Sequence, residues 1–381
     1  MRHPLVERSI GIIAHSPRTV RLALGDNTME AGGAELQLAW TAQLLQERGW
    51  QVRLVMPQSD QDAPTGHVGG FDIIPAHYSG KGGGAVGYVT NTVNRYWHAL
   101  AAADASLYLH RGATGLAGWT ALFSQLKGRR TVLSAASNLD VAPELQSGEA
   151  RQSRLNRTLY QYYLRHCSLV MVQSPDQARL YHERHGRQAV EIPNIAEVPD
   201  KVTPKSSEPL VAWAGAIRKC KRPLWVLDVA RKLPEVRFAI AGGPNPGEDA
   251  LWEELQREAE GVPNVALLGW LPVSGVQDLL GQAWVSLCTS QMEGFPNVYL
   301  MSWGQRTPLV TSFGAGDLVA NSAAGFVADD PEGLAAAIHG LIADQFLRRD
   351  MGDRGRQYTI ARHGRKVVGD RYDEILTRLL R

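Results

Sequence analysis

Short apolar runs alternate with segments of helical periodicity along almost the whole chain. Glycine, proline or serine bounds each apolar run, and the helical segments place apolar residues three or four positions apart. This alternation is typical of parallel sheets that helices cover on both faces. In the first half it predicts five strands, at residues 10–15, 51–56, 105–110, 130–135 and 169–174, and helices that include residues 34–48 and 151–165.

The alternation breaks at residues 197–209 and then starts again. Three prolines and no apolar period mark this stretch, so we interpret residues 199–209 as a linker. The last segment, residues 365–381, is an amphipathic helix that needs a packing partner, with Val368, Tyr372, Ile375 and Leu379 on one face. The second half is predicted to form strands at 210–215, 236–242, 264–269, 283–288 and 308–312, with helices that include 222–232 and 249–258.

The pattern therefore predicts an α/β protein of two doubly wound, Rossmann-like domains. Residues 1–198 would form the first domain and residues 210–363 the second, and a chain of 381 residues is long enough for both. In such folds ligands bind at the carboxyl ends of the parallel strands. We expect the two sheets to present these ends to a shared cleft.

Composition excludes several classes of protein. A net charge of +2 gives no reason to expect a nucleic-acid binder. Three widely spaced cysteines argue against a disulfide framework and against zinc, and they fit a reducing cytoplasm. Neither the first residues nor any later apolar run has the length of a signal peptide or a membrane span.

A basic turn follows the first strand of the second half. It contains Arg218 and Lys221 within residues 214–223. A diphosphate is well recognised by the point charge of a lysine together with the planar fork of an arginine. Basic side chains on loops are usually only solvated, but the place of this turn at the carboxyl end of a strand favours a ligand contact.

A second candidate site stands where Glu293 and Gly294 precede a predicted helix. That helix opens near Pro296, where the missing amide hydrogen costs nothing, and its first free amides attract an anion. Gly33 lies at a similar helix entry in the first half, where glycine lets backbone amides approach a phosphate. The alternative for Gly33 is a flexible helix entry without a ligand.

Polar residues also end two strands of the first half, His110 with Arg111 at one and Asn138 with Asp140 at the other. Residues at such positions often touch ligand in open α/β sheets. A lone histidine is more often a structural hydrogen-bonding group than a catalyst, so only the location of His110 favours a ligand contact.

Three further patterns are weaker. Gly82 to Gly87 spell a GxGxxG, but no strand runs into it, so a loop over the cleft is favoured over a dinucleotide site. Asp60 and Asp62 form a DxD in a polar loop, which argues against a metal site. The arginine-rich helix 151–165 has the composition of a membrane-surface helix, but an ordinary amphipathic surface helix is the favoured interpretation.

Taken together, five segments resemble the retaining glycosyltransferases of family 4, also called group 1, of bacterial surface-polysaccharide type. The resemblance covers nearly the whole chain, and its most specific element is the block that begins at Glu293. It implies the GT-B fold, in which a C-terminal helix, here residues 364–381, returns to the first domain. The segments are residues 32–35, 215–223, 240–244, 264–272 and 290–310.

The resemblance also implies a reaction. A hexose-type sugar would move from a nucleotide diphosphate sugar, with UDP or GDP as the nucleotide, to a glycan or lipid-linked glycan acceptor. The first domain would lie on the acceptor side and the second would bind the donor. The anomeric configuration would be retained, without a metal or another cofactor. The enzyme would act in the cytoplasm, where contact with the face of the inner membrane is an option.

Carried onto this sequence, the resemblance assigns a role to each candidate residue. Lys221 and Arg218 would hold the diphosphate, Glu293 would meet the sugar hydroxyls, and His110 would lie beside the reacting sugar. The other donor contacts would come from Gly33, Gly215, Gly294, Phe295, Pro296, Asn297, Val298 and Met301, and the acceptor-side contacts from His110, Arg111, Asn138 and Asp140.

Two positions depart from the family pattern. Ala216 stands where an arginine is usual, and Met301 stands where a glutamate usually binds the ribose. These departures keep open the alternative of a donor-binding partner subunit without transferase activity. A second alternative is a nucleotide-sugar epimerase, an isomerase on a similar two-domain fold. An epimerase would convert the sugar nucleotide with no acceptor present, and a partner subunit would bind it without turnover.

Overall fold

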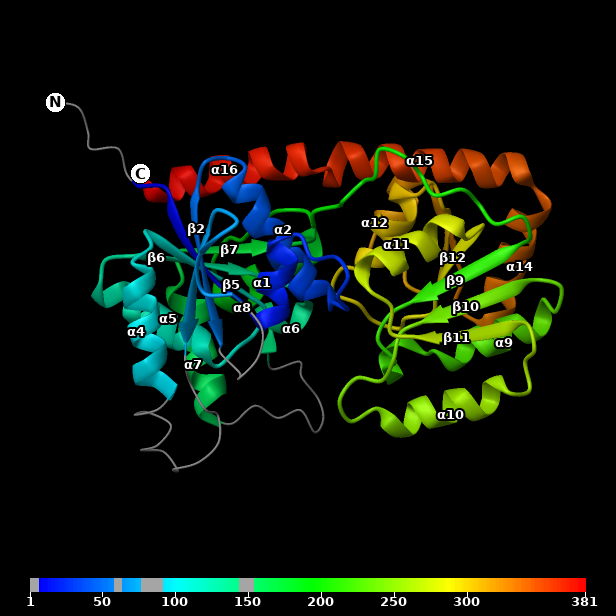
Figure 1. Ribbon diagram of the computed structural model, residues 1–381, viewed down its shortest axis with the longest axis horizontal. Helices are drawn as coiled ribbons and strands as arrows, with labels where there is room; N and C mark the ends of the chain where they lie inside the picture. The colour runs from blue at the N-terminus through cyan, green and yellow to red at the C-terminus, as the bar shows by residue number, and fades with distance from the viewer. Residues whose placement is uncertain (1–6, 58–63, 77–91, 144–153) are drawn as a thin grey trace. The chain divides into compact units, whose positions relative to one another are not determined.

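The computed structural model describes residues 7–57, 64–76, 92–143 and 154–381, coloured along the chain in Figure 1. The chain divides into two compact units. The first comprises Met1–Asp26, Gly33–Ile195 and Lys366–Arg381, and the second comprises Asn27–Gly32 and Ala196–Arg365. The glycine motif at residues 82–87, Asp60 and Asp62 lie outside the described residues.

The first unit contains an eight-stranded sheet in the order β3-β4-β2-β1-β5-β6-β7-β8. All its strand pairs are parallel except β3 with β4, which are antiparallel. The five predicted strands are confirmed as β1, β2, β5, β6 and β7. The strands are β1 Ser9–Ile13, β2 Gln51–Pro57, β3 Gly66–Val68, β4 Phe71–Ala76, β5 Leu107–Arg111, β6 Arg130–Ser134, β7 Leu169–Val172 and β8 Val190–Glu191.

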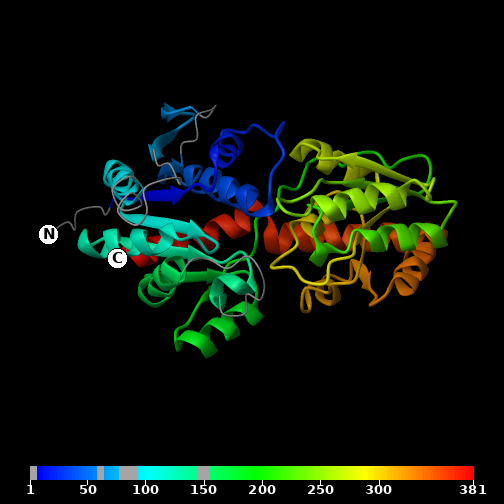
Figure 2. The same ribbon diagram turned by 90° about the horizontal axis from the view of Figure 1, so that it is seen from below.

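Helices lie on both faces of this sheet, as Figure 2 shows. On one face, Tyr96 and Leu100 of α4 and Phe123 of α5 pack against Ile13 and Tyr108 of the central strands, as the apolar alternation requires. The helices are α1 Pro17–Ala23, α2 Gly33–Gln46, α4 Asn94–Ala103, α5 Leu116–Leu126, α6 Asn138–Val141, α7 Arg154–His166, α8 Pro175–His185 and α16 Arg365–Leu380.

The C-terminal helix α16 packs on the first unit, and its partner is the region where α2 ends. Arg48 forms an ion pair of 3.0 Å with Asp370, and Trp50 Nε1 donates to Asp373 at 2.7 Å. The predicted apolar face is partly confirmed, because Val368 and Tyr372 are buried and Ile375 and Leu379 are half-buried. Leu376, which the prediction left out, is also buried.

The second unit contains a six-stranded, fully parallel sheet in the order β11-β10-β9-β12-β13-β14. The five predicted strands are confirmed, and β14 adds a short sixth. Residues 199–209 form no helix or strand and lead directly into β9. The strands are β9 Leu210–Ala214, β10 Arg237–Ala241, β11 Val265–Gly269, β12 Val285–Cys288, β13 Leu309–Thr311 and β14 Gly325–Val327.

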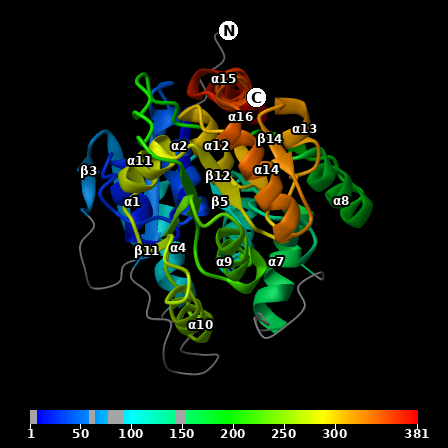
Figure 3. The same ribbon diagram turned by 90° about the vertical axis from the view of Figure 1, so that its right-hand side faces the viewer.

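Helices cover both faces of this sheet (Figure 3). Alternate residues of a strand point to opposite faces. Val211 and Trp213 of β9 pack with α9, α10 and α14, whereas Leu210 and Ala212 pack with α11. The helices are α9 Leu224–Lys232, α10 Asp249–Ala259, α11 Val273–Gln282, α12 Asn297–Gly304, α13 Leu318–Ser322, α14 Pro331–Ala343 and α15 Gln345–His363. Among the described residues, no helix is both long enough and apolar enough to cross a bilayer.

Candidate active site

The second unit has a topological switch point between β9 and β12. From β9 the chain proceeds outward through β10 and β11, and from β12 it proceeds in the other direction through β13 and β14. The loops that leave the carboxyl ends of β9 and β12 therefore diverge to opposite sides and leave a crevice, where open α/β sheets bind ligands. Both predicted donor motifs lie on these two loops.

Lys221 lies on the first of these loops, in a short 3-10 helix, Lys219–Lys221, between β9 and α9. Its stem passes beside Gly215, where an added Cβ would approach Lys221 Cδ to 3.3 Å. The absence of a side chain at Gly215 thus makes room for the lysine. Arg218 begins the same turn and is exposed.

Glu293 lies on the second loop and meets Lys221. Lys221 Nζ and Glu293 Oε1 are 2.6 Å apart, and the two side chains are 19% and 15% exposed. Ser290 Oγ donates to the same carboxylate oxygen at 2.6 Å. The structure thus brings together two residues that are 72 positions apart and leaves both charges accessible at the crevice.

Two further hydrogen bonds tie these loops to each other. Thr289 Oγ1 donates to the Lys221 carbonyl at 2.7 Å, and the Gln291 amide donates to the Cys220 carbonyl at 2.7 Å. Trp213 Nε1 in turn donates to Thr289 Oγ1 at 3.0 Å from the centre of β9. Sequence inspection gave no signal for Ser290 or Thr289, because serine and threonine at a strand end are too common to single out.

Helix α12 begins where it was predicted, directly after Pro296. Pro296 is extended, and no side chain caps the helix start. Phe295 is half-buried and packs 5.4 Å from the His363 ring, so it anchors the loop in the unit's core. Gly294, Asn297 and Val298 are half-buried around the same helix start.

Met301, which the family pattern places at the ribose, packs against an apolar cluster. The cluster includes Ala212 of β9, Ala241 of β10 and Leu280 of α11, and Met301 is partly buried against it. This environment accounts for an apolar side chain at position 301. A ribose contact by Met301 stays a prediction.

Two glycines of segment 240–244, which carries part of the family resemblance, directly follow β10 at the neighbouring strand end. Gly242 has φ +144°, and a Cβ there would lie 1.8 Å from the Gly215 carbonyl oxygen. A Cβ on Gly243 would lie 2.4 Å from Nε1 of Trp270, whose side chain follows β11 and is 41% exposed. These glycines let backbone and indole pack closely beside the crevice.

The first unit has its own switch point between β1 and β5, and His110 lies at the end of β5. His110 is only 1% exposed. Its Nε2 lies 2.6 Å from Thr120 Oγ1 and 3.3 Å from Tyr96 Oη. Burial, with the nearby His15, lowers the pKa of His110 to about 3, so the ring is neutral. This is the environment of a structural histidine, and a contact with a sugar stays a prediction.

The other predicted acceptor-side residues differ in exposure. Asn138 is exposed at the start of α6. Asp140 is buried, and its carboxylate accepts hydrogen bonds from the amides of Ala113, Ala136 and Ser137 at 2.6 to 2.9 Å. Burial raises the pKa of Asp140, while these amides and Arg111 oppose the rise. The Asp140 side chain therefore fastens two strand-end loops, which differs from the expected free contact with an acceptor.

Arg111 is also buried, although it too was expected to meet the acceptor. Its Nη1 donates to Ser134 Oγ at 2.8 Å and its Nη2 to Asn194 Oδ1 at 3.1 Å. Burial lowers the pKa of Arg111 below its ordinary value, and Tyr372 and Asp140 act in the opposite direction. These contacts show Arg111 as part of the framework below the strand ends.

Half-buried groups beside this framework were missed. His15, directly after β1, lies with Nε2 2.7 Å from the Arg111 carbonyl. Ser16 donates a hydrogen bond to Glu35 in the first turn of α2, close to the exposed Gly33. The signal for His15 was its place after a buried apolar strand. Across the described residues, no three His, Cys, Asp or Glu side chains are grouped as a metal site would need.

Two family models match consecutive parts of the chain. The model described as "Glycosyl transferase 4-like domain" matches residues 32–195, and the model described as "Glycosyl transferases group 1" matches residues 208–344. Apart from Gly32, the first match lies in the first unit. The second match lies in the second unit, where it includes both Lys221 and Glu293.

A curated relative is the lipopolysaccharide core biosynthesis glycosyltransferase LpsE of Rhizobium meliloti (strain 1021), which is 27% identical over 184 residues. That match covers 46% of this chain and about half, 52%, of the relative.

Solved structures share the fold over nearly the whole chain. Sucrose-phosphate synthase from Thermosynechococcus elongatus is 19% identical with a TM-score of 0.78, and the match covers 98% of this chain and 99% of that one. HepE from Anabaena, in complex with UDP and glucose, is 18% identical with a TM-score of 0.74, over 97% and 99% of the two chains. The predicted GT-B fold class, with two Rossmann-like units, is confirmed.

Proposed function

Because the chain belongs to the group 1 glycosyltransferases, we propose that it transfers a sugar from a nucleoside diphosphate sugar to an acceptor hydroxyl with retention of configuration. The observation that carries this proposal is the pair of Lys221 and Glu293 at the switch point of the second unit, beside the start of α12. A cation, a carboxylate and a helix start are the three groups that a diphosphate linked to a polyhydroxyl sugar requires.

Each residue has a task in this reaction. Lys221 and the exposed Arg218 bind the diphosphate, with the first amides of α12 directed at its oxygens. Glu293 accepts hydrogen bonds from sugar hydroxyls. As the bond from the anomeric carbon to the phosphate oxygen breaks, the diphosphate gains charge, and these fixed groups stabilise it more than they stabilise the bound donor. The donor-binding role of the second unit and the acceptor-side role of the first are part of the proposal.

The bond to the acceptor oxygen would form on the face of the sugar that the leaving phosphate occupies. The departing phosphate oxygen would take the acceptor proton, so no enzymatic nucleophile and no metal would be required. We propose a hexose as the sugar, UDP or GDP as the nucleotide, and a glycan or lipid-linked glycan as the acceptor. The relation to a lipopolysaccharide core glycosyltransferase supports a role in bacterial surface polysaccharide synthesis, at the cytoplasmic side of the membrane.

The test uses the purified chain with a panel of UDP- and GDP-sugars, with and without chelator, and with and without oligosaccharide acceptors. We expect one donor to yield free nucleoside diphosphate and an elongated acceptor at a rate that the chelator does not change. Conversion of the donor without any acceptor would instead indicate an epimerase. Tight binding of a donor without turnover would indicate a partner subunit, and loss of turnover on chelation would refute the metal-free mechanism.

A further inference from the structure

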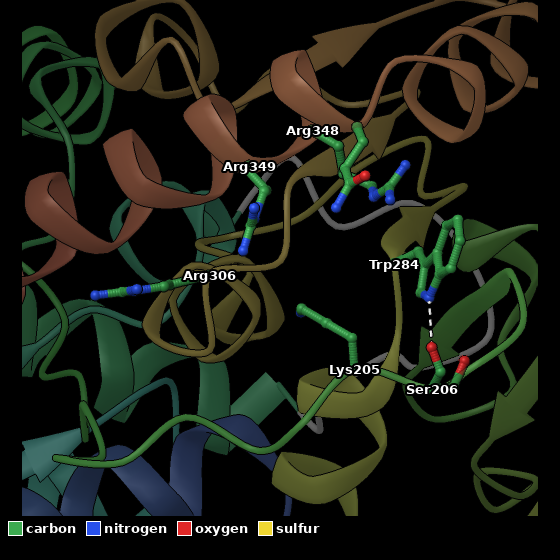
Figure 4. A pocket seen from close by; sticks show the side chains of 7 residues that line it. Lys205, Ser206, Trp284, Arg306, Arg348 and Arg349 are labelled. Carbon is green, nitrogen blue, oxygen red and sulfur yellow. Dashed lines mark hydrogen bonds between the residues drawn. The ribbon is translucent and has the colours of Figure 1, made fainter.

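A basic pocket lies at the opposite edge of the second unit's sheet. It has a volume of about 290 Å³, and its lining includes Lys205, Ser206, Trp284, Arg306, Arg348 and Arg349 (Figure 4). Lys205 precedes β9, Trp284 directly precedes β12, and Arg306 precedes β13. The pocket thus lies at the amino ends of the strands, whereas Lys221 and Glu293 follow the carboxyl ends. It is separate from the proposed donor site.

The charge of this pocket is unbalanced. Four of its seven lining residues are cationic, and none is acidic. Arg306 pairs with Asp353 at 3.2 Å, and in Figure 4 its side chain points away from the centre of the pocket. The remaining three cations, Lys205, Arg348 and Arg349, have no carboxylate partner among the residues that the structure describes.

Arg348 forms one wall. Its guanidinium stacks over the Trp284 ring at 4.0 Å, and its Nη1 donates to the Leu341 and Ile342 carbonyls at 2.7 and 3.0 Å. These contacts fix the plane of the guanidinium and use only one of its nitrogens. Burial, together with the neighbouring Arg349, lowers the pKa of Arg348 below its ordinary value. Asp344 opposes this shift, but among the described residues it forms no ion pair with Arg348.

Lys205 forms the opposite wall. Its stem is exposed, but its ammonium donates to the Ala283 carbonyl at 2.9 Å, to the Gln305 carbonyl at 3.3 Å and to Thr307 Oγ1. Burial of the ammonium, with a smaller contribution from Arg348, lowers the pKa of Lys205 to about 7. Arg348 therefore disfavours the positive charge of Lys205, although burial is the larger cause of the shift.

Arg349 is the residue best placed to meet a ligand. It is exposed, it has no hydrogen-bond or ion-pair partner within the described parts of the chain, and it points toward the Lys205 side chain in Figure 4. Arginine forks bind phosphate oxygens through two parallel hydrogen bonds. The volume is near the lower end of the range for ligand pockets, ~300 Å³, which suits a small phosphorylated group.

From this arrangement we propose that the pocket binds a phosphate group between Arg349 and Arg348. The Lys205 ammonium, whose three N–H groups already donate to protein oxygens, adds positive charge without a direct hydrogen bond. The phosphate would relieve the mutual repulsion of the three cations, which nothing else in the pocket balances. It has two chemical sources, a free phosphate or the headgroup of an anionic phospholipid. Phe346, 83% exposed beside the lining residue Gln345, is an apolar side chain that a lipid surface would cover.

The experiment compares two substitutions on the same helix of the full-length protein. Arg349→Gln removes the free guanidinium, and Arg354→Gln is the matched control, since Arg354 pairs with Asp350 and does not line the pocket. Calorimetry with inorganic phosphate and co-sedimentation with phosphatidylcholine vesicles, with and without phosphatidylglycerol, test the two sources. Lys221→Met shows how much of the phosphate signal comes from the donor site.

We expect one of the two probes to bind about tenfold more weakly to the Arg349→Gln protein, the loss for one charge-assisted contact. The Arg354→Gln and Lys221→Met proteins should keep this binding. If only the binding of inorganic phosphate depends on Arg349, the ligand is a free ion. If only the binding of anionic vesicles depends on Arg349, the ligand is a lipid headgroup. Equal binding of both probes by the Arg349→Gln and Arg354→Gln proteins overturns the proposal.

Discussion

The pair of Lys221 and Glu293 allows a prediction that separates binding of the nucleotide from recognition of the sugar. We consider two substitutions that keep side-chain size, Lys221→Met and Glu293→Gln. In the structure the ammonium and the carboxylate are 2.6 Å apart, so each neutralises the other in the absence of donor. If Lys221 binds the diphosphate and Glu293 the sugar, removal of each charge must act on a different part of the ligand.

The magnitudes follow from the environment of the pair. Loss of one preorganised charged contact in an active site costs about 3 kcal/mol in the transition state, or roughly a hundredfold in rate. Each substitution also leaves the other charge half-buried and unpaired, which lowers the free energy of unfolding by about 1 to 2 kcal/mol. The exposed pair of Lys232 and Glu332 provides the matched control, because solvent screens its charges and Lys232→Met should change neither turnover nor melting.

The assay is calorimetry with UDP and with the UDP-sugar that supports turnover, or with the GDP compounds if these are the donor. Lys221→Met should weaken binding of both compounds. Glu293→Gln should weaken the sugar nucleotide only, and UDP should bind at least as tightly as before, because Lys221 is no longer neutralised by a carboxylate. Equal weakening of UDP and UDP-sugar by Glu293→Gln would refute a sugar contact and reduce Glu293 to a group that positions Lys221.

Three other expectations can be tested on single variants. The free energy of unfolding should fall by ~1.4 kcal/mol per pH unit as the pH drops from about 6.5 toward 3. The reason is that the pKa of His110 is lowered in the folded protein, so the unfolded chain takes up the proton first. In urea unfolding, the His110→Gln protein should lack this part of the pH dependence. Gly242→Ala should lower the free energy of unfolding by about 3 kcal/mol, because its Cβ would meet the Gly215 carbonyl. Gly340→Ala, on an open helix face, should raise it by ~0.5 to 1 kcal/mol, and melting experiments can measure both changes. Met301→Glu should tighten nucleoside diphosphate binding by ~1 kcal/mol and lower the melting temperature; a lower melting temperature without tighter binding would assign Met301 to packing alone.

Periodicity was sufficient to predict ten of the strands, because each is a short, mostly apolar run between turn signals. The strands that it missed are the short edge strands β3, β8 and β14 and the inner strand β4, whose apolar run Asp72 and Pro75 interrupt. β8 has two residues and β14 has three, and neither is long enough to show a period. Edge strands also pair on one side only, so their sequences are less constrained to be apolar. Helix α16 was predicted because it is long and its apolar residues recur on one face over its whole length.

The sequence predicted where the candidate site lies better than it predicted the contacts within the site. A strand end at a switch point is visible in the sequence, and this located Lys221 and Glu293. That the two form an ion pair was not visible, because 72 residues separate them. The same rule did not show whether Asp140 contacts a ligand or only its own protein. A carboxylate at a strand end can bind a ligand or fasten its own loop through backbone amides, and only the fold shows which amides are within reach.

The two switch points differ in a way that bears on their roles. In the first unit, the titratable groups of His110, Arg111 and Asp140 are almost fully buried, and protein partners hold them. In the second unit, the side chains of Lys221 and Glu293 are 19% and 15% exposed, and Arg218 is exposed. A diphosphate carries concentrated negative charge, so it needs cations that are partly desolvated but still accessible. Of the two switch points, that of the second unit offers such cations. An uncharged acceptor hydroxyl needs instead a rigid wall and a few hydrogen-bonding groups, and the buried framework of the first unit is suited to provide that wall.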